Sequence, residues 1–179
     1  GDTVSYGTNH ILQIKGTVSF RDVNSRVVAI GEDVLKNYTV KTADARTIVI
    51  GSRAMEFVTS PETNSIAIGD SSLRYASGFG NIAIGPNVMS SNLMSSGSLN
   101  TAVGRDALQR LTSAGNNAAF GYLTGNSITT GGSNALFGAQ AGTRITTGAQ
   151  NTAVGFLALD RVTTGGFNTA IGAEAGNAY

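Results

Sequence analysis

The chain of 179 residues contains no cysteine, and His10 is its single histidine. Without cysteine it can form neither a disulfide framework nor a thiolate metal site. His10 has no second ligand at metal-binding spacing, so we expect an ordinary surface residue, no metal ion and no cofactor. Asp and Glu show no pair that recurs at a fixed position. This argues against a glycosidase-type carboxylate pair, and we predict a protein that is not an enzyme and has no catalytic residue.

Charge is also scarce, since only 13% of the residues are charged, against about 25% in ordinary domains. The formal net charge is +1, which gives no reason to expect a nucleic-acid partner or an anionic membrane surface. No apolar run approaches the roughly 18 residues of a membrane span, so we predict no membrane insertion. The chain opens with Gly1 and Asp2 and not with Met, and we interpret it as a piece of a longer protein.

A short repeat dominates the rest of the sequence. From Asn100 to Gly176 the same unit of 17 residues recurs. Each copy opens with Asn and reaches a Gly four residues later, as in Asn100 to Gly104 and Asn117 to Gly121. Self-similarity at a short fixed period is typical of a solenoid. Seventeen residues suit one coil with two short strands and two turns, since strands average about five residues. The segment Asp106–Leu111 has a helical composition, but its counterpart Leu123–Ile128 is a poor helix former, so we expect a coil at both.

The repeat extends back to Val27, but there the steps from one copy to the next are uneven. The uneven steps place insertions in loops at 37–45 and 59–63. We therefore predict two parts, N-terminal cap or linker strands in 1–26 and an all-β, parallel β-solenoid of about nine coils in 27–179. The nine glycines that close the coils are Gly31, Gly51, Gly69, Gly85, Gly104, Gly121, Gly138, Gly155 and Gly172.

The residue before each of these glycines trades volume with the residue five positions later. Phe137 is matched with Gly142, whereas Val154 is matched with Leu159. Two positions that share one packed space would show this trade, so we expect the Val, Phe and Ile row to point into the coil. Strand side chains alternate, and the preceding row would then point outward. That row is small and apolar, which predicts that another chain covers it, unless alanine is merely tolerated there: Ala102, Ala119, Leu136, Ala153 and Ala170.

Two families resemble this repeat. The stretch Asn64-Ser65-Ile66-Ala67-Ile68-Gly69 resembles the head repeat of trimeric autotransporter adhesins, although the adhesin repeat is shorter. The longer unit that begins at Asn151 and ends in Thr163-Thr164-Gly165 is similar to the repeats of bacteriophage tail fibres. The resemblance covers 27–176 and implies a left-handed parallel β-roll assembled as a parallel homotrimer. It also implies that the outward row named above forms the trimer interface.

The resemblance further implies a structural and receptor-binding segment of a phage tail fibre, located on the virion and attached to a host cell-surface glycan or protein. The alternative is the head domain of a bacterial trimeric adhesin on the cell surface. Less favoured are an ice-binding solenoid, suggested by stacked pairs such as Thr129-Thr130, and a polysaccharide-cleaving tailspike. The variable turns supply the candidate receptor contacts: Arg105, Tyr122, Arg144, Phe156 and Phe167.

Overall fold

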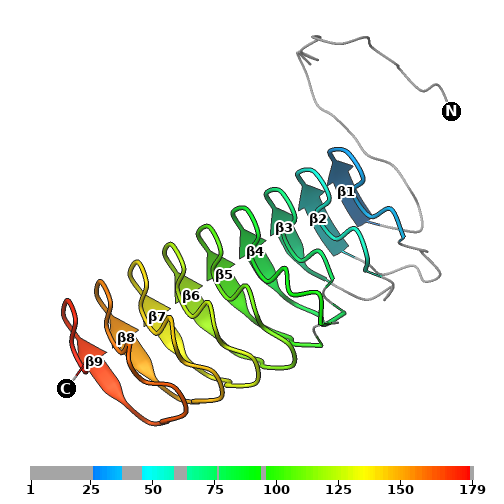
Figure 1. Cartoon of the computed structure of the whole chain (residues 1–179). Helices are drawn as coiled ribbons and strands as arrows, with labels where there is room; N and C mark the ends of the chain where they lie inside the picture. The colour runs from blue at the N-terminus through cyan, green and yellow to red at the C-terminus, as the bar shows by residue number, and fades with distance from the viewer. Residues whose placement is uncertain (1–25, 38–45, 59–63, 76, 94–95, 178–179) are drawn as a thin grey trace, which may run out of the picture.

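The computed structural model describes residues 26–37, 46–58, 64–75, 77–93 and 96–177 as a single row of coils (Figure 1). One strand of each coil joins a nine-stranded parallel sheet in which the strands follow chain order, with about eight full turns between the first and the last. The strands are β1 (Arg26–Ile30), β2 (Arg46–Ile50), β3 (Ile66–Ile68), β4 (Ile82–Ile84), β5 (Thr101–Val103), β6 (Ala118–Phe120), β7 (Ala135–Phe137), β8 (Thr152–Val154) and β9 (Thr169–Ile171).

The pairing of the strands follows the sequence repeat. Ala102 lies opposite Ala119, and Ala119 lies opposite Leu136, so equivalent residues of successive units form columns along the sheet. The described residues contain no helix, and Asp106–Leu111 is a series of turns. The prediction of an all-β parallel solenoid is therefore confirmed. The predicted cap strands in 1–26 lie outside the described residues, except for Arg26. The predicted insertions at 37–45 and 59–63 also lie outside the described residues, except for Asn37.

The second strand expected in each coil is replaced by a ladder of turns. In the fifth coil Asp106 and Leu108 have left-handed backbone, with φ of 58° and 48°. The amide of Asp106 donates to the carbonyl of Pro86 in the preceding coil at 3.1 Å, and the amide of Leu108 donates to Thr124 in the following coil at 3.0 Å. Left-handed backbone costs a non-glycine residue about 1–2 kcal/mol. Hydrogen bonds to both neighbouring coils and the full burial of Leu108 offset this cost.

The residue that closes each coil must be glycine, because the closing glycine of the next coil lies very close to it. Gly121 has a φ of +138°, which side chains rarely allow, and a Cβ there would lie 2.6 Å from the carbonyl oxygen of Gly138. The same close approach of one closing glycine to the next recurs along the ladder, for example at Gly104 and Gly138. Only glycine lets the backbones of successive coils approach this closely.

The predicted orientation of the strands is wrong. Ala102, Ala119, Leu136 and Ala153 are fully buried inside the coil and Ala170 is 6% exposed, whereas Phe137 is 41% and Val154 36% exposed. The alanine row faces the interior because larger side chains from the turns, such as Leu108 and Ile128, already fill the space opposite the sheet. Side chains buried within one chain cannot form an interface with a second, so the proposed trimer-interface row is corrected here.

The volume trade seen in the sequence has a different partner. A Cβ at Gly125 would lie 2.9 Å from Cδ1 of Leu136, and a Cβ at Gly142 would lie 3.1 Å from Cδ2 of Leu136. Leu136 is the largest side chain in the inward row, and it occupies the space that Leu108 and Leu159 fill in the coils of Ala102 and Ala153. Phe120 and Phe137 instead stack on each other on the outside, with ring centres 4.9 Å apart.

The asparagine that opens each unit forms a buried ladder through the core. The Asn134 side-chain amide donates to Oδ1 of Asn117 at 3.0 Å and to the carbonyl of Gly148 at 3.0 Å. Its Oδ1 accepts from both the backbone and the side-chain nitrogen of Asn151, each at 3.0 Å. Both donors and both lone pairs of the amide are thus used. The same pattern links successive units from Asn81 to Asn168 and ties each coil to the next.

Candidate binding surfaces

Neither a metal centre nor a membrane helix is found in the part of the chain that the structure describes. No group of three or more His, Cys, Asp or Glu residues could hold a metal ion there. No helix in those ranges has the length and apolarity that crossing a membrane requires. His10 lies outside the described residues. The surfaces that remain are a largely apolar sheet face and a polar groove.

The outer face of the sheet carries the first of these surfaces. The first and third residues of the short strands point outward, because only the middle residue is buried. From Ile48 in β2 to the end of β9 none of the outward residues is charged, and apolar contiguous surfaces of this extent mark interaction sites. We define the outer face as Ile48, Ile50, Ile66, Ile68, Ile82, Ile84, Thr101, Val103, Ala118, Phe120, Ala135, Phe137, Thr152, Val154, Thr169 and Ile171.

A polar groove of about 570 Å³ opens on the turn side of the solenoid. It lies where the repeat is irregular, since the step from Gly69 to Gly85 is shorter than in the regular units and the step from Gly85 to Gly104 is longer. Insertions in repeat proteins map to loops on one face, which is often the binding face. The groove is lined by Arg74, Tyr75, Ser90, Ser91, Asn92, Leu93, Gln109, Arg110 and Thr129.

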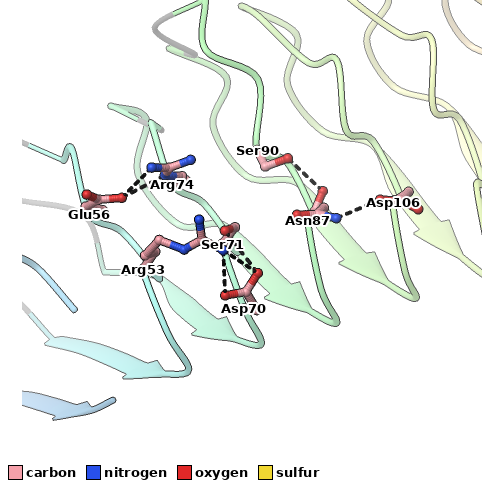
Figure 2. A network of polar contacts seen from close by, with 8 residues as sticks. All are labelled: Arg53, Glu56, Asp70, Ser71, Arg74, Asn87, Ser90 and Asp106. Atoms are coloured by element: carbon pink, nitrogen blue, oxygen red, sulfur yellow. Dashed lines mark hydrogen bonds and ion pairs between the residues drawn. The ribbon is translucent and has the colours of Figure 1, made fainter. Parts of the chain in front are cut away.

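Ion pairs and hydrogen bonds between coils hold the turns around this groove (Figure 2). Nε of Arg74 donates to Oε2 of Glu56 at 2.8 Å, and the Glu56 carboxylate is almost fully buried. The side-chain nitrogen of Asn87 donates to Asp106 at 3.2 Å. Ser90 Oγ donates to the carbonyl of Asn87 at 3.0 Å. The buried Glu56 keeps Arg74 in place, because a buried carboxylate without its partner is strongly unfavourable.

Two aromatic rings stack at one end of the groove. Phe57 and Tyr75 are nearly parallel, with ring centres 4.8 Å apart and an angle of 3°. The Arg74 guanidinium carbon lies 5.3 Å from the Phe57 centre and 5.2 Å from the Tyr75 centre. A group stacked on the outer face of one ring would be much farther from the centre of the other ring. Arg74 therefore lies beside the stacked pair and does not itself cover the far side of the Tyr75 ring.

The five predicted receptor contacts are all exposed, but they do not form one site. Arg105, Tyr122 and Phe156 belong to the column that follows the closing glycines, where Ala139 separates the two aromatic residues. Arg144 lies in another column, 3.9 Å from Asp160, and Phe167 lies on the turn before Asn168. Arg105 forms an ion pair with the adjacent Asp106 at 3.3 Å. Their contact with a receptor stays a prediction.

The threonine pairs are only half available for a ligand. The hydroxyl of Thr112 donates to the carbonyl of Thr129 at 2.9 Å, and the hydroxyl of Thr129 donates to Thr146 at 3.2 Å. The first threonine of a pair thus joins coils, while the second, as at Thr130 and Thr147, is exposed. The ice-binding interpretation requires a flat surface on which both threonine hydroxyls of each pair are free. These hydrogen bonds occupy one hydroxyl of each pair.

The groove was not among the sites predicted from the sequence. Tyr75 and Arg110 are far apart in the chain, yet both are the sixth residue after a closing glycine, as Phe57 is. Two signals could have indicated the groove: the irregular steps on either side of Gly85 and the two aromatic residues at one position of the unit. Comparisons provide no further guide, since no family model, curated protein or solved structure shows significant similarity to this chain.

Proposed function

We propose that the chain is a structural and receptor-binding segment of an attachment fibre, the tail fibre of a bacteriophage, in which three copies assemble in parallel through the outer face. The observation that carries the proposal is the outer face itself, which contains no charged residue and runs from Ile48 to the end of β9. A left-handed winding, as in the adhesin head repeat, is part of the same proposal. The fibre would be carried on the virion and would bind a glycan or a protein on the host surface.

Self-association follows from the repetition of this face. A closed cyclic arrangement buries the same surface on each copy, so one apolar column is enough to define the interface. In a parallel trimer Phe137 of one chain would lie at the level of Phe137 in the other two. The outer face extends over eight strands, β2 to β9, so each copy would contribute outward side chains along the whole length of the interface.

A rigid rod with variable turns suits attachment. Nine strands about 4.8 Å apart give a rod of roughly 38 Å. The Asn ladder and the hydrogen bonds between turns stiffen it along its whole length. Exposed turn residues such as Tyr122 and Phe156 are free to contact a receptor. The Ile-Ala-Ile sequences of β3 and β4 keep the bacterial adhesin head as a second candidate.

Light scattering tests the assembly. The wild-type protein should have about three times the mass of the 18.3 kDa chain. Val154→Arg should give a monomer, because it places three charges in a dry interface. Val154 is 36% exposed in the single chain, so the coil itself should still fold. Thr147→Arg adds the same charge to an exposed turn and should remain trimeric.

A monomeric wild type, or a Val154→Arg variant that assembles as before, would contradict the proposed interface. The attachment role is tested separately by adding the fluorescently labelled trimer to a panel of bacterial cells. Saturable binding to some strains, which excess unlabelled trimer displaces, is the expected result. Failure to bind any cell of a broad panel would leave a fibre segment without a receptor-binding role.

A further inference from the structure

We propose that the polar groove binds an anionic sugar, a hexose that carries a carboxylate or a phosphate group, with its ring stacked on Tyr75 and its anionic group paired with Arg110. This inference rests on the proposed attachment function and names the chemical class of the receptor. It concerns one groove in each chain, which is built without any residue of a second chain.

Arg110 is the cation of the groove that is free to bind a ligand. Its side chain is exposed, and no carboxylate or other acceptor pairs with the guanidinium among the residues that the structure describes. Arg74, the other cation in the lining, is held by Glu56 at 2.7 Å. An unpaired guanidinium presents a planar set of donors that fits a carboxylate or a phosphate in a two-point contact.

Tyr75 provides a flat apolar surface opposite this cation. Phe57, Tyr75, Ser91 and Arg110 occupy the same position in four successive coils. Phe57 covers one side of the Tyr75 ring, and the next residue in the column, Ser91, is too small to stack on the other side. Tyr75 and Arg110 both line the groove, so one ligand bound within it could contact both side chains.

Amide and hydroxyl groups also line the groove. The Ser90 hydroxyl donates to Asn87, and the Gln109 amide is partly used by Asp106 and Asn126. Asn92 adds an exposed amide with both donors and acceptors, which are the groups that sugar hydroxyls need. The volume of about 570 Å³ lies in the usual range of small-ligand sites, roughly 300–1,000 Å³. Among the described residues of the lining, Leu93 is the one aliphatic side chain.

No other coil in the regular part of the solenoid repeats this combination. At the same position the later units carry Ser127, Arg144 and Arg161, with no aromatic residue in that column after Tyr75. The site is therefore specific to the irregular coils around Gly85, and a trimer would carry three. Arg161 provides a matched control, because it is an exposed arginine three units beyond Arg110 in the same column but outside the groove.

Isothermal titration with three sugar probes tests the inference. Digalacturonic acid carries carboxylates, glucose 6-phosphate carries a phosphate, and maltose is neutral. We expect at least one anionic probe to bind at least tenfold more tightly than maltose. Arg110→Gln should weaken that binding at least tenfold, Tyr75→Leu should weaken binding of all three probes, and Arg161→Gln should leave the binding of all three unchanged. Tighter binding of either anionic probe than of maltose supports the site. The anionic probe that binds more tightly shows whether the site prefers a carboxylate or a phosphate.

Two results would overturn the inference. One is that neither anionic probe binds more tightly than maltose. The other is an equal loss for Arg110→Gln and Arg161→Gln, which would show diffuse charge attraction and no defined site. The same titration on the monomeric Val154→Arg variant separates the two proposals. If the wild type is monomeric but the chain binds the anionic sugar, the trimer proposal fails and the groove proposal stands. If the wild type is trimeric but binds no probe, only the groove proposal fails.

Discussion

Leu136 fills the space left by two glycines, and its replacement by alanine should destabilise the protein more than any other single truncation in the inward row. The side chain is fully buried, and neither Gly125 nor Gly142 has a side chain that could move into the vacated space. Truncation of buried leucine to alanine costs about 2–5 kcal/mol, and the cost rises with the volume of the cavity that remains. Because this site cannot collapse, we expect about 4–5 kcal/mol for Leu136→Ala.

A second substitution should restore much of this loss. Leu108 and Leu159 show that the backbone accepts leucine at the position of Gly142 with left-handed φ, 48° and 53° against 60° at Gly142. Gly142→Leu alone should be unfavourable, because its Cβ would lie 2.9 Å from Cδ1 of Ile145 and 3.1 Å from Leu136. Combined with Leu136→Ala, the new leucine gains the vacated space. We expect the double variant to be more stable than the sum of the single changes by about 1–3 kcal/mol.

Urea unfolding followed by circular dichroism measures all four proteins of this cycle. The Val154→Arg background should keep the chain monomeric, which would remove the dependence of stability on protein concentration. Phe137→Val is the matched change in the neighbouring outward residue and should cost far less in that background, since Phe137 is 41% exposed. If the two changes at Leu136 and Gly142 were simply additive, the shared-space explanation of the repeat would be refuted.

Three further substitutions test the ladder and the core by the same unfolding measurement. Asn117→Ala removes four buried hydrogen bonds and should cost about 3 kcal/mol or more; a loss below about 1 kcal/mol would show that the ladder is not needed. Gly121→Ala should be much more destabilising than Gly172→Ala, because the added Cβ meets the next coil only at Gly121, and equal losses would exclude this contact as the cause. Ser72→Ala should stabilise the protein by about 1 kcal/mol, because the buried Ser72 Oγ has no hydrogen-bond partner among the described residues; a clear loss would reveal one.

The period and the strands could be predicted from the sequence, but the face that points inward could not. The repeat fixes that Leu136 and Phe137 lie on opposite faces, and both rows are apolar, so Gly142 could be matched with either residue. The residue that shows which row points outward lies two positions before the outward residue of the same strand. Thr152 shares the face of Val154, and its hydroxyl indicates an outer face, as does Thr101 for Val103.

The groove depends on information that only coordinates supply. Several arginines lie on the turns near it or in its column, and the sequence does not show which of them is paired. In the structure Arg74 is bound to the buried Glu56, whereas Arg110 has no such partner in the described ranges. The short step before Gly85 and the long step after it also hide the fact that Tyr75 and Arg110 line one groove.

The inverted orientation has a consequence for stability. A core built from alanine on the strand side buries little apolar surface, while the larger isoleucine, valine and phenylalanine side chains stay on the outer face. Burial contributes about 25 cal/mol per Å² of apolar surface, so the larger gain is realised only when a partner covers that face. Folding and assembly should therefore be linked. The unfolding midpoint of the wild type should rise with protein concentration, whereas that of Val154→Arg should not.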